Sequence, residues 1–385
     1  MAVYLDCAAT TPLLPAVREE MLHYLSEDFG NAGSRTHDYG RRARAGVERA
    51  RDRVAAVVEC SRGDVVFTSG ATESNNLAIL GLAGHAETSG RKHIVSTAIE
   101  HHAVLEPLAE LERRGFQIDR VIPDATGAVD AAAVQQALRP DTLLVSVMQV
   151  NNETGVVQPL AEIASILHDT DIVFHVDGAQ GFGKELSALR NSRIDLVSIS
   201  GHKIHGPKGI GALIVRRRDG SRPPLQPLMY GGGQERGLRP GTLPVPLIAG
   251  FGKAAEMALT ECDARQDQCR RFRQRLMEGL APLRPVLNGD PDRSVHHIVN
   301  LSIPGLDAES VIEAWRDLAA ISQGAACTAQ TYTCSHVLGS MDLPTAQQDG
   351  AVRLSWCHFT PLPDFSSMVE AIHRARQESR STTHE

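Results

Sequence analysis

The sequence lacks any long hydrophobic run. No stretch of its 385 residues approaches the roughly 18 consecutive apolar residues that a membrane-spanning helix requires. The opening segment, MAVYLDCAATTPLLP, also lacks the basic stretch followed by an apolar one that marks a secretory signal. These two absences predict a cytoplasmic protein without a membrane partner.

The sequence also lacks an excess of positive charge. Its 39 lysines and arginines are outnumbered by 46 acidic residues, which gives a net charge of −7 and argues against a broad nucleic-acid-binding surface. Two basic segments, RRARAGVERARDR and RQDQCRRFRQR, interleave acidic or polar residues at helical spacing. A solvated helix face explains them better than a nucleic-acid patch does. We expect no direct contact with nucleic acid.

Paired cysteines are missing as well. The seven cysteines are an odd number and show no repeated spacing; they are residues 7, 60, 262, 269, 327, 334 and 357. This scatter does not indicate a disulfide framework, and it lacks the close pairs of a zinc site. We expect free thiols in a reducing compartment, of which one or two are reactive.

What the sequence does have is a regular alternation of short apolar runs and helix-like segments from about residue 60 to residue 230. The expected strands are residues 65–69, 93–98, 143–150, 171–177, 196–200 and 211–217. Most of these runs are nearly continuous in Val, Ile and Leu, as expected of strands covered on both faces. The alternation predicts an α/β fold with a mainly parallel, doubly wound sheet.

The pattern changes after about residue 240. A long helix is predicted over residues 245–282, followed by a strand, a helix, a strand and a last helix, which is typical of an α+β unit. We therefore expect two domains. The large, ligand-binding domain would comprise residues 16–255, and the small one residues 1–15 together with 256–385.

Polar residues follow most of the expected strands of the large domain. The groups are Gly70–Glu73, Glu100–His102, Asn151–Gly155, Asp177 with Gln180, and Ser200–Lys203. Because ligands of parallel α/β sheets bind at the carboxyl ends of the strands, we expect these groups to converge on one site.

Each of these groups also has a plainer interpretation. The segment SGATESNN places small residues and Thr72 at a helix N-terminus, which favours a phosphate, but Ser69 or Thr72 could simply cap the helix. Asp177 ends a buried strand and needs a cationic or N–H partner, yet it could instead cap the next helix. His101 could lie flat on an aromatic ligand or be an ordinary loop histidine.

The segment SISGHKIHGPKGIGALIV contains two lysines in a glycine-rich turn between two strands. Lys203 lies at a strand end, where a desolvated amine becomes a nucleophile able to form a Schiff base. Lys208 is expected to face solvent or a phosphate. A phosphate site, a strand-end carboxylate, a flat histidine and a buried lysine together indicate pyridoxal phosphate.

The motifs DGAQ, SGHKIHGPKGIGAL and GGGQERGLRPGT occur in the order and spacing of a known family. With YLDCAATTPLLPAV, FGNAGSRTHDYG and VNNETGVVQP, they make the chain similar to the cysteine desulfurases of the NifS/IscS type. These are fold-type I pyridoxal-phosphate enzymes of the class V aminotransferase group, and the resemblance covers essentially the whole chain. It implies an enzyme that converts L-cysteine to L-alanine and passes the sulfur to an acceptor protein.

The resemblance implies a role for each matching residue. Lys203 would bind the cofactor covalently, Asp177 would pair with its pyridinium nitrogen, Gln180 would reach its phenolic oxygen and His101 would stack on its ring. The phosphate would be held by Ala71, Thr72, Ser200 and His202, and by Thr242 of a second subunit in a homodimer. Asn152 and Arg353 would bind the substrate carboxylate. Lys203 or His101 would move the α-proton.

The segment SQGAACTAQTYTC contains Cys327, which matches the family's sulfur-accepting cysteine. It would become a persulfide, whereas Cys334 is expected to be structural or incidental, with a relay role as the alternative. The family usually has serine–glycine–serine–alanine–cysteine here, so Gln323 and Ala325 depart from it. That departure removes a hydroxyl near the thiolate.

The family feeds iron–sulfur assembly, tRNA thiolation or DNA phosphorothioate modification. We expect a dedicated system, with the desulfurase of DNA phosphorothioation (Dnd) as the first candidate. A selenocysteine lyase or another pyridoxal-phosphate aminotransferase is the alternative enzyme. A non-catalytic metal or sulfur carrier built from Cys327, Cys334, His336, Cys357 and His358 is the alternative of another class.

Overall fold

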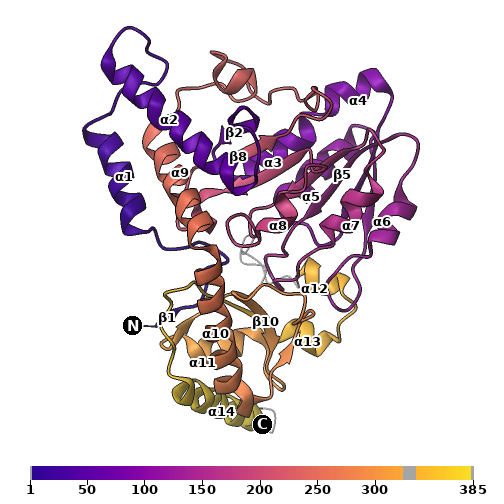
Figure 1. The fold of residues 1–385 in the computed structure, drawn as a ribbon. Coiled ribbons are helices and arrows are strands. Elements are labelled where there is room, and N and C mark those ends of the chain that lie inside the picture. Colours follow the sequence, from indigo (N-terminus) through magenta and orange to yellow (C-terminus); the bar gives the residue numbers. More distant parts are fainter. Residues whose placement is uncertain (1, 324–334, 383–385) are drawn as a thin grey trace.

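The protein forms two bodies joined by a pair of consecutive helices (Figure 1). The computed structural model describes residues 2–323 and 335–382, and the side chains of residues 2–323 and 335–378. The helices of the larger body are α1 (Pro15–Ser26), α2 (Asp38–Val57), α3 (Ala71–Leu80), α4 (Ala83–Ser89), α5 (His102–Arg113), α6 (Ala131–Ala137), α7 (Leu160–Ile166), α8 (Leu186–Leu189) and α9 (Val245–Thr260). Its strands are β2 (Val65–Thr68), β3 (His93–Thr97), β4 (Gln117–Val121), β5 (Thr142–Met148), β6 (Val173–Asp177), β7 (Leu196–Ser200) and β8 (Gly211–Val215).

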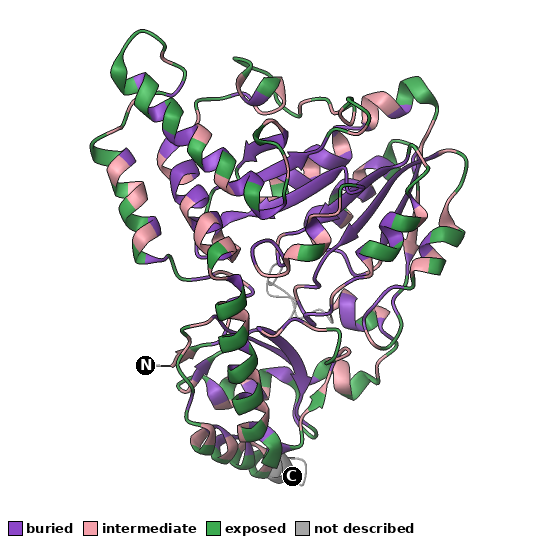
Figure 2. Ribbon diagram, viewed as in Figure 1, coloured by how far each residue is buried: buried purple, intermediate pink, exposed green. Residues whose placement is uncertain are grey.

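These strands form one seven-stranded sheet in the order β2-β8-β7-β6-β5-β3-β4, parallel from β4 to β7. Strands β5, β6 and β7 are buried along their whole length, and Figure 2 shows the sheet enclosed by helices. Successive residues point to opposite faces: Leu144 joins a core under α3 and α5, and Val145 joins a core under α2, α7 and α9. The predicted mainly parallel, doubly wound α/β fold is confirmed.

Strand β8 runs antiparallel to both of its neighbours, β7 and β2. Only residues 201–210 connect β7 to β8. A parallel connection needs a crossover of a dozen or more residues, so this short turn reverses the chain instead. The turn carries Lys203 and Lys208, and the reversal therefore holds both lysines at the carboxyl edge of the parallel strands.

The smaller body is built on a three-stranded antiparallel sheet with the order β12-β10-β9 and a two-stranded parallel pair, β1 with β11. Its strands are β1 (Val3–Tyr4), β9 (Val286–Leu287), β10 (Ile298–Ser302), β11 (Ala319–Ala320) and β12 (Ala351–Ser355). Its helices are α10 (Cys262–Leu280), α11 (Ala308–Trp315), α13 (Thr345–Asp349) and α14 (Phe365–Thr382). The short helix α12 (His336–Ser340) instead packs Val337 and Leu338 into the core of the large sheet. Short 3₁₀ helices occur in both bodies. The larger body contains η1 (Arg62–Asp64), η2 (Gly201–Lys203) and η3 (Gln234–Gly237), and η4 (Ala281–Leu283) follows α10.

The prediction of one continuous helix over residues 245–282 is wrong, because the structure has two helices there. The chain leaves helical geometry at Glu261, whose φ and ψ are −110° and 8°, so α9 and α10 are separate helices. Helix α9 packs on α1 and α2 of the larger body, and α10 packs on α14 of the smaller one. The break therefore falls where the chain passes from one core to the other. None of the helices in residues 2–323 and 335–382 is long and apolar enough to cross a membrane.

Candidate active site

A cavity of about 440 Å³ lies where the parallel strands end and β12 of the smaller body approaches. Ten of the residues singled out in the sequence line it: Ala71, Thr72, His101, Asn152, Asp177, Gln180, Ser200, His202, Lys203 and Arg353. The predicted convergence of strand-end groups is thus observed. Two predicted site residues are not among the lining: Thr242 is exposed on the surface, and Cys327 lies outside the described residues.

One end of the cavity offers the donors that a phosphate requires. Helix α3 begins after Gly70, whose φ of +153° suits glycine, and no side chain of the described residues caps it. The interpretation of Ser69 or Thr72 as an ordinary cap is therefore wrong, and Ser69 instead donates its N–H to Glu73 Oε2 at 2.7 Å. The first N–H groups of α3 face the cavity beside the Ser200 hydroxyl. Position 211 requires glycine, because a Cβ there would collide with the Ile199 carbonyl oxygen and lie 2.7 Å from Gly70 Cα, at the start of α3.

His202 and Lys208 lie at the same end. Burial, together with the charges of Lys203 and Lys208, lowers the pKa of His202 to about 4. The ring is therefore neutral at physiological pH and acts as a hydrogen-bonding group; its Nδ1 lies 3.2 Å from Thr10 Oγ1. The positive charge at this end of the cavity comes from the lysines.

Lys203 is anchored by the N-terminal segment of the chain. Its Nζ donates to the carbonyl oxygens of Ala8 at 2.5 Å and Ala9 at 2.9 Å. Gln180 donates its Nε2 to the same Ala8 carbonyl at 2.8 Å, while its Oε1 is buried with no partner in the described part of the chain. The same carbonyl thus holds the lysine amine and the glutamine amide, although it lies about 170 to 195 residues away from them in the sequence.

Asp177 ends β6 with its carboxylate in the cavity wall. Its Oδ1 accepts the Ala179 N–H at 2.9 Å, and its Oδ2 accepts from Asn75 Nδ2 at 2.7 Å. The contact with Ala179 is the capping role that the sequence left open, but the carboxylate also faces the cavity. Asn75 was not predicted. Its signal was its place in SGATESNN, one helical turn after Ala71 and therefore on the same face of α3.

His101 lines the cavity after β3, and Glu100 is buried next to it in the chain. His101 Nδ1 accepts the Ala103 N–H at 3.0 Å, which fixes the ring at the start of α5, and burial lowers its pKa. Glu100 is fully buried, and its Oε1 accepts from Thr97 Oγ1 and the Met148 N–H, both at 2.8 Å. Burial raises the pKa of Glu100 to about 8, so this carboxyl is mostly protonated at neutral pH.

Arg353 brings a guanidinium from β12 into the cavity. It is 3% exposed, donating from Nη1 to the Asn152 carbonyl at 2.9 Å and from Nη2 to Asp6 Oδ1 at 2.8 Å. Its Nε is buried and has no partner among the residues that the structure describes. A buried guanidinium with an unused donor is suited to a carboxylate ligand.

The residues on either side of the undescribed segment 324–334 are fixed beside this cavity. Ser322 exchanges two backbone hydrogen bonds with Arg353, at 2.7 and 3.2 Å. On the other side, Ser335 donates to Glu153 Oε2 at 2.6 Å and His336 Nε2 lies 2.9 Å from the Glu100 carbonyl. The residues that flank the segment containing Cys327 and Cys334 are thus held by Arg353, which lines the cavity, and by Glu100 and Glu153, which are neighbours in the chain of the lining residues His101 and Asn152.

Of the residues proposed for a metal or sulfur carrier, Cys327 and Cys334 lie outside the described residues. The three described ones do not gather: His336 lies 2.9 Å from the Glu100 carbonyl, whereas Cys357 and His358 line a different cavity. No group of three His, Cys, Asp or Glu residues that could hold a metal ion occurs in residues 2–323 and 335–382. The described part of the chain therefore gives that hypothesis no site.

The donor set of the large cavity fits pyridoxal phosphate. It combines a helix N-terminus with nearby hydroxyls, a strand-end carboxylate, a glutamine amide with an unpartnered oxygen, and a lysine held by backbone carbonyls. These are the groups that a phosphate, a pyridinium nitrogen, a phenolic oxygen and an aldehyde require.

Comparison with known proteins agrees with this geometry. Residues 3–364 match the model of the family described as aminotransferase class-V. The cysteine desulfurase IscS of Vibrio cholerae serotype O1 is 42% identical over 384 residues, which is 99% of this chain and 94% of that protein. The cysteine desulfurase IscS of Methylococcus capsulatus is 44% identical over 373 residues, 97% of this chain and 92% of the relative.

Several solved structures are also similar to this chain. DndA from Streptomyces lividans has a TM-score of 0.81 and 49% identity, covering 92% of this chain and 99% of its own. A NifS-like protein has a TM-score of 0.88 and 32% identity over 99% of this chain and all of its own. SspA, solved in complex with cysteine, has a TM-score of 0.82 and 35% identity over 94% and 99% of the two chains. The chain belongs to the aminotransferase class-V family, whose members use pyridoxal phosphate, and within it to the cysteine desulfurases.

Proposed function

We propose that this protein converts L-cysteine to L-alanine and transfers the sulfur first to its own Cys327 and then to an acceptor. The observation that carries the proposal is the convergence of Lys203, Asp177 and Arg353 on one cavity, from three separate parts of the chain. A lysine, a carboxylate and a guanidinium so placed can hold the cofactor and an amino acid together.

The cofactor supplies an electron sink that makes bonds at the α-carbon of an amino acid easier to break. Lys203 would hold it covalently, and Asp177 would face its pyridinium nitrogen. Gln180 would reach its phenolic oxygen and His101 would lie against its ring. Ala71, Thr72, Ser200 and His202 would bind its phosphate. Asn75 supports this arrangement because its amide fixes the orientation of the Asp177 carboxylate.

Arg353 and Asn152 would bind the carboxylate of L-cysteine. Arg353 reaches the cavity with an unpartnered Nε, and its two Nη atoms are already oriented by Asn152 and Asp6. A guanidinium prefers bidentate contact with a carboxylate, and this one is held in place before the substrate arrives. The amino acid is thereby positioned with its α-carbon toward Lys203.

Proton transfer falls to Lys203 and His101. Once the substrate amine takes its place, the Lys203 amine is available to accept the α-proton. His101 is neutral at physiological pH, because burial lowers its pKa, and Nδ1 is occupied by the Ala103 N–H. Its Nε2 therefore carries the proton that it can donate.

Cys327 would accept the sulfur. Its thiolate attacks the substrate sulfur, an S–S bond forms as the C–S bond breaks, and the electron pair of the broken bond is left with the carbon part that is protonated to alanine. The position of the flanking residues supports this role. Cys327 lies four residues beyond Gln323, a chain reach of roughly 13 Å. The residue before Gln323, Ser322, pairs with Arg353.

The division into domains is part of the proposal: residues 16–255 form the large domain, and residues 1–15 with 256–385 form the small one. Two separate cores support it. Val17 and Phe251 pack in the core of the large sheet, whereas Leu5 packs with Trp315 and Trp356 in the smaller body. The cavity at their junction would then change shape if the domains moved relative to one another.

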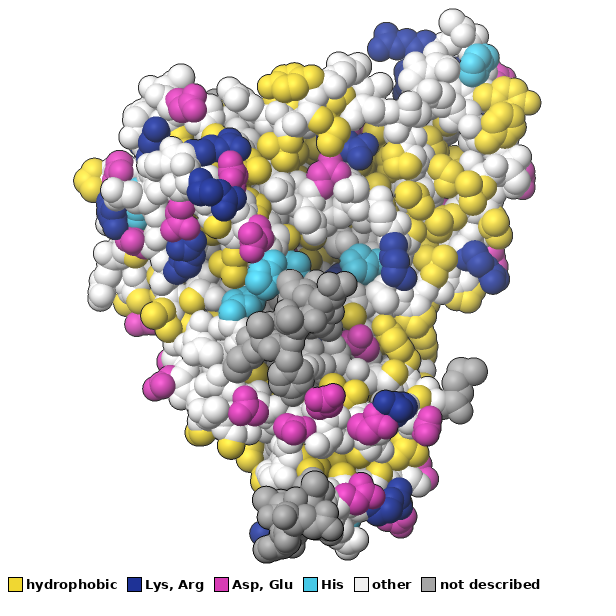
Figure 3. Space-filling view, turned by 180° about the vertical axis from the view of Figure 1, so that it is seen from behind, with side chains coloured by type: hydrophobic (Ala, Val, Ile, Leu, Met, Phe, Trp, Pro, Cys, Tyr) yellow, Lys and Arg dark blue, Asp and Glu magenta, His cyan; other side chains and the backbone are white. Residues whose placement is uncertain are grey.

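A homodimer would complete the site, with Thr242 of a second subunit contributing to the phosphate cradle. Thr242 is exposed here, after a segment in which Tyr230 is 85% exposed. Figure 3 shows hydrophobic side chains gathering on the flank that carries α1. The exposed members include Leu22, Leu25 and Phe29, at 52%, 58% and 65%. Apolar surface of this kind is typical of a subunit interface.

The acceptor is proposed to belong to a DNA phosphorothioation system. The likeness to DndA, at 49% identity, supports this choice, and the likeness to IscS at 42–44% leaves iron–sulfur assembly and tRNA thiolation as the other outcomes. The net charge of −7 favours a protein acceptor over direct contact with DNA. The reaction is proposed to take place in the cytoplasm.

The proposal is tested by measuring alanine and sulfide release from L-cysteine in the presence of a thiol reductant. We expect equal amounts of both from the wild type, loss of both in Cys327→Ser, and full activity in Cys334→Ser. Full activity in Cys327→Ser would instead favour another pyridoxal-phosphate aminotransferase. A much higher rate with selenocysteine than with cysteine would favour a selenocysteine lyase.

A further inference from the structure

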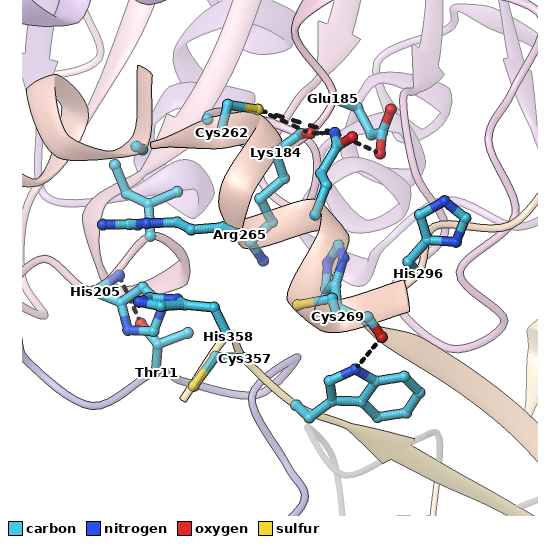
Figure 4. Close-up of a pocket in the computed structure, with 16 residues that line it drawn as sticks. Thr11, Lys184, Glu185, His205, Cys262, Arg265, Cys269, His296, Cys357 and His358 are labelled. Carbon is cyan, nitrogen blue, oxygen red and sulfur yellow. Dashed lines mark hydrogen bonds between the residues drawn. The ribbon is translucent and has the colours of Figure 1, made fainter. Parts of the chain in front are cut away.

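A second, smaller cavity lies behind the active site, between α10, the turn after β7 and the chain beyond β12. Its volume is about 50 Å³, enough for one or two water-sized molecules. In Figure 4, Lys184 and Arg265 lie above His205, His358 and Cys357. The active-site chemistry uses none of these five side chains.

Three thiols surround the amine of Lys184. Cys269 and Cys357 line the cavity, and Cys7, which is not part of the lining, is close enough for its charge to act on the Lys184 amine. Cys7 and Cys357 sit on neighbouring segments, since Cys7 donates its N–H to the Ser355 carbonyl at 3.1 Å. Their two side chains also contact each other, with the Cys7 thiol as the donor and the Cys357 sulfur as the acceptor. Both are free thiols in this structure.

The surroundings of Cys357 stabilise a thiolate. Its sulfur lies 3.4 Å from Thr360 Oγ1 and accepts from Cys7. The hydrogen bond from Cys7, followed by that from Thr360, lowers the pKa of Cys357 to about 6, and the Lys184 charge acts in the same direction. The other two thiols differ: the contact with Cys357 and burial raise the pKa of Cys7, and burial raises that of Cys269 to about 12.

The histidines around these thiols carry no charge at physiological pH. Burial lowers the pKa of His205 to about 3 and that of His358 to about 4, and His297 is lowered well below its usual value. The Nε2 of His297 is buried and has no hydrogen-bond partner in the described part of the chain. The cavity thus offers a neutral acceptor or donor to a small polar molecule beside a thiolate.

We propose that Cys357 and Cys7 form a redox-active dithiol that a small hydroperoxide oxidises to a disulfide. A reactive thiolate with a second thiol in contact and a cavity that admits only a very small reagent is the arrangement this reaction requires. The site is a modification site distinct from the sulfur-transfer chemistry at Cys327.

The reaction balances with the peroxide as the oxidant. The Cys357 thiolate attacks one peroxide oxygen, the O–O bond breaks, and the leaving hydroxide takes a proton to become water. The Cys7 sulfur then attacks the sulfenic sulfur, the S–O bond breaks, a second water leaves and the S–S bond forms. Two thiols and one hydrogen peroxide give one disulfide and two waters.

The position of Cys7 connects this dithiol to the active site. The next two residues, Ala8 and Ala9, supply the carbonyl groups that hold Lys203, and Ala8 also holds Gln180. A covalent bond at Cys7 constrains the backbone that carries these carbonyls. We therefore expect oxidation to lower the rate of alanine formation by several-fold and a dithiol reductant to restore it.

The test treats the reduced holoenzyme with one equivalent of hydrogen peroxide, blocks the remaining thiols in denaturant and maps the peptides by mass spectrometry. We expect a linked pair that joins the Cys7 and Cys357 peptides, lost after reduction. This readout does not depend on activity, so it can succeed even where the proposed sulfur transfer fails. Recovery of both cysteines as free thiols, or linkage of Cys357 to Cys269, would overturn the proposal.

Two variants sharpen the test. In Cys7→Ser, we expect Cys357 to stop at the sulfenic acid, which a dimedone probe labels. The matched control is Cys60→Ser, because Cys60 is a free thiol that packs against the core of the large sheet and does not line this cavity, so the linked pair should be unchanged. Equal labelling of Cys357 by dimedone in Cys7→Ser and the control would contradict a resolving role for Cys7.

Discussion

Two lysines approach the same N-terminal segment from two different cavities. Lys203 reaches the Ala8 and Ala9 carbonyls from a cavity of about 440 Å³, and Lys184 lies near the Cys7 thiol in one of about 50 Å³. The first cavity collects a carboxylate, an amide and a guanidinium from several strand ends. The second collects thiols and neutral histidines.

The difference shows that a buried lysine does not define a function by itself. Around Lys203 there is room for a cofactor and an amino acid, together with groups that would hold each part of them. The cavity around Lys184 is far smaller, at about 50 Å³. The same side chain is therefore assigned covalent catalysis in one place and thiolate stabilisation in the other.

The largest expected effect on activity comes from replacing each of the two lysines, one at a time, with an uncharged residue. Lys203→Ala removes both the covalent link to the cofactor and a proton acceptor, so we expect kcat/KM for alanine formation to fall by about 10³-fold or more. Lys184→Met keeps a side chain of similar length, and we expect less than about a 3-fold loss. A comparable loss of kcat/KM in both variants would contradict the assignment of catalysis to the cavity of Lys203 alone.

The next effect concerns Asn75, which acts through Asp177. Asn75→Ala removes a hydrogen bond to a charged carboxylate, a loss of about 1.5 kcal/mol, and we expect kcat to fall about 10-fold with KM nearly unchanged. The absorption band of the bound cofactor should also shift, because its ring loses the fixed carboxylate. Asn76→Ala is the matched control, since Asn76 is bonded only to the Thr72 carbonyl in the described hydrogen bonds.

Two buried groups, Glu100 and Lys184, should make the stability of the fold respond to pH in opposite directions. Burial raises the pKa of Glu100 to about 8 from 4.5, so the folded protein holds a proton that the unfolded chain has lost. The stability contributed by this group is therefore lost as the pH rises from about 4.5 through about 8. Glu100→Gln should flatten the fall of the unfolding free energy over that range, measured by urea denaturation; an unchanged slope would contradict it.

The smallest expected effect is the contribution of Lys184 to stability at alkaline pH. Burial lowers the pKa of Lys184 to about 8 from 10.5, so the unfolded chain binds the extra proton between those values. This group therefore makes the folded state more stable as the pH rises from about 8 to about 10.5. Lys184→Met should remove that rise in urea denaturation midpoints, and a rise of the same size in the variant would show that another group is responsible.

Much of the large cavity was predictable because local patterns define it. Buried strands read as apolar runs, and parallel strands place the residues that follow them at one edge, which brought Asp177, His101 and Lys203 together. The direction of β8 and the break at Glu261 were not predicted. Both depend on the length of a connection or on which core a helix meets, and hydrophobic periodicity contains neither.

The thiol cavity could not be predicted from the sequence at all. Its lining residues Lys184, Cys269 and Cys357, and the neighbouring Cys7, are far apart in the chain and share no spacing. They meet because the N-terminal segment pairs with the end of β12 and α10 packs above it. The roles of Ala8 and Ala9 could not be predicted either. They act through backbone carbonyl groups, which every residue has, so the residue type does not indicate the role.

The most direct measurement asks which lysine carries the cofactor. Borohydride reduction of the holoenzyme fixes the pyridoxyl group on its lysine, and peptide mapping then identifies the residue. The account predicts a pyridoxyl group on Lys203, with Lys184 and Lys208 unmodified. A pyridoxyl group on Lys184 or Lys208 instead would contradict it, because the assignment of the large cavity as the site of sulfur release depends on Lys203.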